Sequence, residues 1–245
     1  MASSRSSLRT RVGRLLQSLP PRLQCAVIGW RSRGRVERGE HSFIHRSVQV
    51  LGKSAVAVGR NSVLAQDCWL NVNHRDTDAK SIVIGDNCFI GRRNFFSSGR
   101  AIVLKDFVLT ANDCHFLGST HVTDDPMRPV ITTGTTASDT IVVGVNTFIG
   151  AGARLVGDVT VGHGCIVAAG STVTKSMPPF SQVVGHPATA RKRYSVIRGA
   201  WVPLAEFSAE DERALPSESD YLEMLRRHPP IAMPYIAAGS DLGNC

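Results

Sequence analysis

The chain has 245 residues, of which 42% are apolar, and a net charge of +8. No apolar run reaches the roughly 18 residues that a membrane-spanning helix needs, and the first residues lack the apolar core of a secretory signal, so we expect one compact cytoplasmic domain with tails. Residues 1–40 hold nine arginines against two glutamates. The rest of the chain is therefore close to neutral, which argues against nucleic-acid binding.

The N-terminal leader, residues 1–45, is basic and is expected to form one or two short helices. It carries Leu15, Leu16 and Trp30 among its arginines, and Pro20 with Pro21 divides it into short pieces. A basic, partly apolar segment of this kind can rest on an acidic membrane surface. Peripheral contact with the inner face of a membrane is one interpretation, and a packed or frayed basic leader is the other.

After the leader, an aliphatic or similar residue returns every sixth position, with two long interruptions at residues 71–80 and 118–140. A shorter slip follows Ser98-Gly99-Arg100, after which the register restarts at Leu104. The hexad positions are Val58, Leu64, Leu70, Ile84, Ile90, Phe96, Leu104, Thr110, Phe116, Val143, Ile149, Leu155, Val161, Val167 and Val173. A period of six fits neither the 3.6 residues of a helix nor the two of an alternating strand. We interpret it as short strands separated by corners, three of which close a triangular coil of about 18 residues.

The repeat predicts an all-β fold, a parallel β-helix over residues 46–190, between the short helical leader and a C-terminal extension. Stacked coils give every strand a parallel neighbour and place the hexad residues in inward-facing columns. The open end of such a prism needs a cap. Residues 191–245 are expected to supply it, with a weak helical pattern over residues 202–228.

Four cysteines occupy one recurring place in the hexads, the fifth. They are Cys68, Cys88, Cys114 and Cys165. Elsewhere that place holds small residues such as Ser62 and Ala153, so the thiols are predicted to be small packing groups. Neither a disulfide framework nor a CxxC pair is visible.

The end of the repeat carries a specific motif. The segment AAGSTVTKSMPP is followed by VVGHPATA, and this pattern resembles the closing signature of the hexapeptide-repeat acyltransferases. The likeness is nearest to the branch of galactoside, maltose and capsule or lipopolysaccharide O-acetyltransferases. It implies a left-handed β-helix, a homotrimer, acetyl-CoA as acyl donor and a sugar or polysaccharide precursor as acceptor, without a metal.

The same resemblance implies the catalytic residues. Counting through the coil before the long interruption places the family's histidine base at His121, with His115 as the rival, and acetyl transfer to a hydroxyl suits a base that titrates near neutral pH. Relatives often have an Asp-His pair here, which this chain lacks. Asp124 or Asp125 could orient the base or contact the acceptor, or be plain loop carboxylates, and Asn94 matches an acceptor-binding asparagine.

For the donor, the resemblance implies a groove between subunits along the uninterrupted hexads. The predicted donor contacts are Phe148, Ala151, Ala169, Gly170, Thr174, Lys175 and Arg191. Lys175 and Arg191 would pair with the phosphates of coenzyme A, and the alternative for them is a solvated capping turn.

Three other functions stay open from the sequence. One is O-acetylation of a xenobiotic such as an antibiotic, and another is a non-catalytic β-helix scaffold. The third and least favoured is a γ-type carbonic anhydrase, which needs zinc-binding histidines, whereas His115 and His121 stand six apart and His163 has no second histidine nearby. His163 and His74 are interpreted as corner residues.

Overall fold

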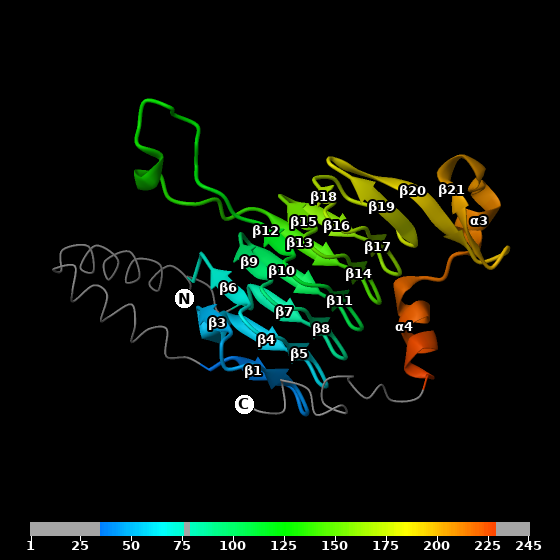
Figure 1. The fold of residues 1–245 in the computed structure, drawn as a ribbon, viewed down its shortest axis with the longest axis horizontal. Coiled ribbons are helices and arrows are strands. Elements are labelled where there is room, and N and C mark those ends of the chain that lie inside the picture. The colour runs from blue at the N-terminus through cyan, green and yellow to red at the C-terminus, as the bar shows by residue number, and fades with distance from the viewer. Residues whose placement is uncertain (1–34, 76–78, 229–245) are drawn as a thin grey trace, which may run out of the picture.

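The computed structural model describes residues 35–75 and 79–228, and these form a triangular parallel β-helix with a C-terminal extension (Figure 1). The chain passes from a first sheet to a second and a third, then returns to the first one level higher. We call them sheets A, B and C. The predicted leader lies mostly outside the described residues, as do residues 229–245.

Within the coils, each sheet consists of parallel strands, one from each coil. Sheet A contains β1 (Glu37–Arg38), β4 (Val56–Val58), β7 (Ile82–Ile84), β10 (Ala101–Leu104), β13 (Thr140–Val143) and β16 (Val159–Val161). Sheet B contains β2 (Phe43–Ile44), β5 (Val63–Leu64), β8 (Phe89–Ile90), β11 (Leu109–Thr110), β14 (Phe148–Ile149) and β17 (Ile166–Val167), and continues into β19 (Ser181–Gly185), β20 (Ala188–Ser195) and β21 (Ala200–Pro203). Sheet C contains β3 (Gln49–Leu51), β6 (Trp69–Val72), β9 (Phe95–Ser98), β12 (His115–Leu117), β15 (Arg154–Val156) and β18 (Thr172–Val173).

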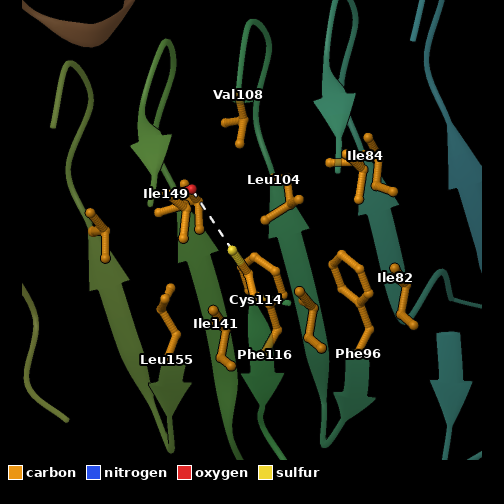
Figure 2. Packing of buried hydrophobic residues seen from close by; sticks show 14 of the residues in the cluster. Ile82, Ile84, Phe96, Leu104, Val108, Cys114, Phe116, Ile141, Ile149 and Leu155 are labelled. Atoms are coloured by element: carbon orange, nitrogen blue, oxygen red, sulfur yellow. Dashed lines mark hydrogen bonds between the residues drawn. The ribbon is translucent and has the colours of Figure 1, made fainter. Parts of the chain in front are cut away.

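The hexad residues form the core, as the sequence predicts. From Val143 to Val173 each hexad residue is fully buried, and successive ones belong to sheets A, B and C in turn. Figure 2 shows Phe96 and Phe116 inside the prism, where their rings stack with centroids 4.6 Å apart. Identical spacing thus places equivalent side chains above one another.

The four hexad cysteines, which we call the corner thiols, are buried and unpaired. Burial raises the pKa of Cys68 and of Cys165 to about 11, and that of Cys88 and of Cys114 to about 12. Their thiol groups approach backbone carbonyls, as Cys114 Sγ does with Ile149 O at 3.8 Å (Figure 2). They are packing groups that stay protonated at neutral pH.

The β-helix begins earlier than the predicted boundary at residue 46. Strands β1, β2 and β3 form a first coil, and Arg38 pairs in register with Val58. The sequence concealed this coil because an arginine stands where the hexad calls for an aliphatic residue. The terminal coil tolerates it, since Arg38 is exposed there.

The predicted boundary at residue 190 also falls inside an element. Strand β20 pairs antiparallel with β19 and with β21, so the extension continues sheet B as a meander. The 3-10 helix η3 (Leu204–Glu206) and two short helices, α3 (Ala209–Ala214) and α4 (Glu218–Arg226), follow. Two other 3-10 helices lie earlier, η1 (Lys53–Ala55) between β3 and β4 and η2 (Val130–Thr132) between β12 and β13. The helical pattern predicted for residues 202–228 is confirmed in part.

Buried charges hold α3 against the meander. Arg193 is 5% exposed, lies over the Phe207 ring at 4.3 Å, pairs with Glu212 and donates to Pro179 O at 2.9 Å. Asp211, in the first turn of α3, accepts hydrogen bonds from Ser195 and from the Ser208 backbone amide. These donors hold the pKa of the Asp211 carboxyl well below its usual range.

Helix α4 lies along the corner between sheets A and B (Figure 1). Glu218 pairs with Lys105 and accepts from Val145 N at 3.1 Å, while the Tyr221 ring contacts His163 with centroids 5.7 Å apart. His163 also donates from Nε2 to Pro216 O at 3.2 Å, consistent with a structural role. No helix within the described ranges is long and apolar enough to cross a membrane.

Candidate functional site

Both interruptions of the repeat lie at the same corner, between sheets C and A. The shorter connects β6 to β7, and the longer, residues 118–139, connects β12 to β13. We call residues 118–139 the arm, because it extends away from the prism (Figure 1). In the other coils the connection from sheet C to sheet A is only a few residues long. Both insertions therefore lie on the same edge of the molecule.

The two ends of the arm are joined tightly to the prism at Gly99. Gly118 N donates to Ser97 O at 2.9 Å, and Arg100 N donates to Asp139 O at 2.8 Å. A Cβ on Gly99 would lie 2.0 Å from the Gly118 carbonyl oxygen. Only a residue without a side chain allows this approach.

His121 lies near the root of the arm, in a short antiparallel ladder. It forms a bridge with Thr135, flanked by Thr136 N donating to Thr120 O at 2.8 Å and Val122 N donating to Gly134 O at 3.2 Å. The ladder fixes its backbone, and the side chain is exposed. Among the described residues its ring makes no hydrogen bond.

His74 supports the arm from the neighbouring insertion. Its Nε2 donates to Thr136 O at 2.8 Å, and Ser119 Oγ donates to the same oxygen at 2.7 Å. Sequence reasoning placed His74 in a polar corner insertion and missed this contact. The sequence feature that could have indicated this contact is the position of the two interruptions in the repeat, since both follow a strand of sheet C.

His115 occupies a different place from His121. It lies on β12 with its side chain on the outer face of sheet C, and its ring meets Phe95 edge-on with centroids 6.1 Å apart. The structure therefore separates the two candidate bases, one on the face of a strand and one on the arm.

The predicted carboxylates Asp124 and Asp125 are both exposed and both lie on the arm. Asp125 Oδ1 accepts from Met127 N at 3.0 Å, which closes a local turn. In the part of the chain that the structure describes, neither carboxylate bonds the ring of His121.

Asn94 is placed inside the prism and has no exposed surface. Its Nδ2 donates to Thr110 Oγ1 at 2.6 Å and to Gly91 O at 3.1 Å, and its Oδ1 accepts from Cys114 N at 2.5 Å. These hydrogen bonds close the corner between sheets B and C. Asn94 occupies the same column at this corner as Cys68 and Cys114. It offers no group to an acceptor in this chain, contrary to the expectation.

The predicted donor residues Ala151, Ala169 and Gly170 line the corner between sheets B and C in the last two coils. Ala151 and Ala169 are exposed, and a Cβ added to Gly170 would meet no atom within 4 Å. Lower on the same corner, Arg93 and Asp113 form a bidentate ion pair. The corner thus changes from charged side chains to alanine and glycine.

The remaining donor candidates are also accessible. Phe148 is 37% exposed on the outer face of sheet B, and Thr174, Lys175 and Arg191 are exposed near the last coil. Arg193, two residues after Arg191, already forms an ion pair with Glu212. A groove of about 390 Å³ between α4 and sheet A, lined by Val83, Val103 and Leu222 among others, contains none of the predicted site residues.

Two segments of the coils match known repeat families. Family models for the bacterial transferase hexapeptide (six repeats) and for the hexapeptide repeat of succinyl-transferase match residues 140–175 and 81–93. These matches cover part of the coils, and the fold is the left-handed parallel β-helix that the resemblance implies.

Several curated relatives are acetyltransferases by name. A probable acetyltransferase of Mycobacterium tuberculosis is 27% identical over 75% of this chain and 57% of its own length. The serine acetyltransferase of Buchnera aphidicola is 34% identical over 46% of this chain and 41% of its length. A putative acetyltransferase of Staphylococcus aureus is 33% identical over 46% and 55%. The chain therefore spans about half the length of the curated relatives it matches.

A solved structure shares the fold. The N-acyltransferase AntD of Bacillus cereus, in complex with dTDP-4-amino-4,6-dideoxyglucose and coenzyme A, superposes with a TM-score of 0.56 at 17% identity, over 80% of this chain and 93% of its own.

Proposed function

We propose that the chain is an acetyl-CoA-dependent O-acetyltransferase that acts on a hydroxyl of a sugar or polysaccharide precursor. The observation that carries the proposal is the arm, which presents His121 from an ordered ladder at the edge of the prism, with its imidazole ring unbonded by any residue in 35–75 or 79–228. The names of the curated relatives support the reaction class.

The proposed reaction needs one base. An imidazole nitrogen of His121 accepts the proton of the acceptor hydroxyl while that oxygen attacks the acetyl carbonyl carbon of acetyl-CoA. The carbon–sulfur bond then breaks, and the departing thiolate takes the proton from the imidazolium. Histidine suits both steps, because it exchanges protons near neutral pH. Asp124 or Asp125 is the proposed orienting or acceptor-binding carboxylate, and Asn94 is left out.

The donor is proposed to lie along the corner formed by Ala151, Ala169 and Gly170. Side chains no larger than a methyl group let the pantetheine arm approach the backbone closely, and Phe148 supplies an apolar wall beside it. AntD, which shares the fold, was solved in complex with coenzyme A. Lys175 and Arg191 would pair with the phosphates, which charge-assisted hydrogen bonds favour.

A homotrimer is part of the proposal. The outer face of sheet B carries an apolar row in register, including Phe43, Leu109, Phe148 and Ile166. Leu109 is 43% exposed in the single chain. Contiguous apolar surface of this kind is typical of a contact with another protein. Light scattering coupled to size-exclusion chromatography should give three times the chain mass, and a monomer would contradict a site shared between subunits.

The test is a thiol-release assay with acetyl-CoA and a panel of sugars, glycan precursors, amino sugars and hydroxylated antibiotics. We expect His121→Ala to lose nearly all activity and His115→Ala to lose much less. The reverse order would refute the assignment of the base. Cleavage of the product by hydroxylamine separates an ester from an amide, and the best acceptor decides between carbohydrate and antibiotic.

A scaffold remains the alternative of another class. Calorimetry separates it from the enzyme, since a scaffold should not bind acetyl-CoA. A folded protein that gives no heat of binding with acetyl-CoA would favour the scaffold.

A further inference from the structure

The outer face of sheet C carries three aromatic rings from successive coils. Trp69, Phe95 and His115 pair in register, with ring centroids 5.0 Å apart for the first pair and 6.1 Å for the second. We call these residues the aromatic row. Trp69 is 43% exposed, and the other two are partly exposed.

The prism does not need these rings for its core. Their neighbours Leu70, Phe96 and Phe116 point inward and are fully buried. Because alternate residues of a strand face opposite sides, the aromatic row lies outside. A large exposed indole contributes little to folding and more often belongs to a binding surface.

Polar groups border the aromatic row, two residues along the same strands. Asn71 Nδ2 donates to Asn73 Oδ1 at 2.7 Å, and Asn73 Nδ2 donates to Ser97 Oγ at 2.9 Å. These two hydrogen bonds fix the orientation of both side-chain amides. Within the described residues, the Asn71 side-chain oxygen accepts no hydrogen bond and is left for a ligand, whereas Ser97 is 8% exposed and serves to hold Asn73.

The strands of the aromatic row lead directly to the arm. Strand β12 carries His115 and ends at Leu117, one residue before the arm begins. Strand β6 carries Trp69 and leads to His74, which bonds Thr136 in the arm. A molecule on the aromatic row therefore lies on the face from which the proposed base emerges.

The chemistry of this face fits a pyranose ring. The C–H groups on one face of a sugar carry partial positive charge and pack against the negative face of an aromatic ring, while its hydroxyls need fixed amides and hydroxyls nearby. Sheet B offers a different surface, an apolar row suited to a second copy of the chain. We propose that the aromatic row is the acceptor subsite and that Trp69 stacks on the pyranose ring. The proposal rests on the proposed function.

Fluorine NMR tests it without catalysis. The full chain is labelled with 5-fluorotryptophan, its three tryptophans are assigned by substitution with phenylalanine, and methyl glucopyranoside, methyl galactopyranoside and maltose are titrated in turn. We expect at least one glycoside to shift the Trp69 signal and leave those of Trp30 and Trp201 in place.

Kinetics with the best acceptor supply the second measurement. Trp69→Ala should raise the acceptor KM at least about tenfold, or about 1.4 kcal/mol, and leave the acetyl-CoA KM unchanged. Trp69→Phe should restore most of the loss. Met224→Ala, which removes an apolar side chain 53% exposed on α4, is the control and should match the wild type.

Three results would overturn the proposal. One is a folded, acetyl-CoA-binding protein whose Trp69 signal no glycoside shifts. Another is dissociation of the oligomer by Trp69→Ala, which would make the aromatic row a subunit contact. The third is a shift with uridine diphosphate and with no glycoside, which would assign the row to a nucleobase. A glycoside shift in a protein that fails to bind acetyl-CoA would keep the sugar site and refute the transferase.

Discussion

Gly99→Ala should damage catalysis through the position of the arm. The added Cβ would lie 2.0 Å from the Gly118 carbonyl oxygen, whereas real contacts of this kind essentially never fall under 3.0 Å. The root of the arm must therefore retreat by about 1 Å, three residues before His121. A misplacement of about 1 Å in a catalytic group can lower the rate about 100-fold.

The assay is kcat per folded protein, with the folded fraction taken from urea unfolding. We expect kcat to fall on the order of 100-fold and the acetyl-CoA KM to stay unchanged. Gly59→Ala is the matched control, because its Cβ would lie 2.5 Å from backbone atoms of Gly85 at a corner remote from the arm. It should lose stability, by about 1–3 kcal/mol as overpacking does, but keep its kcat. Wild-type kcat in Gly99→Ala, or an equal loss in Gly59→Ala, would refute the reasoning.

Three further predictions concern the prism and its extension. Phe116→Ala removes one ring of the stacked buried pair and should lower the free energy of unfolding by about 3–5 kcal/mol in urea titrations, while an unchanged midpoint would contradict the packing described. Asp211 has a pKa below its usual range in the folded protein, so the stability it confers is complete above the ordinary aspartate pKa of about 3.9 and is lost as pH falls below that value. Thermal melts from pH 7 to acid should show this loss, and Asp211→Asn should flatten the dependence relative to wild type. Iodoacetamide should label the corner thiols only after unfolding, because burial keeps them protonated and covered, and peptide mass spectrometry of the native protein would detect any exception.

The repeat made the coil predictable, because the interior of a β-helix depends on local spacing alone. A residue six positions on occupies the next face, and one eighteen positions on fills the same column, so the buried positions from Val143 to Val173 follow from the sequence. The same rule indicated the role of Asn94, which shares its hexad place with Cys114. The family resemblance outweighed that signal in assigning it to the acceptor.

The features that were missed depend on residues distant in the chain. The antiparallel meander was obscured because β20 buries Arg193, which no hydrophobic pattern reveals until Glu212 is known to neutralise it. His74 meets Thr136 across 62 positions, and only the folded coil brings them together. Periodicity predicts the residues that recur in every coil. It does not predict these two contacts, because each of them occurs only once.

The shared corner of the two insertions also has a consequence for engineering. Chain added between sheets C and A leaves every strand in register, because β12 and β13 keep their partners on both sides of the arm. The arm can therefore be exchanged for another loop without a change in the pairing of the strands on either side. Loops from other sources should be graftable there onto an unchanged prism, provided that they keep a histidine at the place of His121, so that the surroundings of the base can be varied without redesigning the fold.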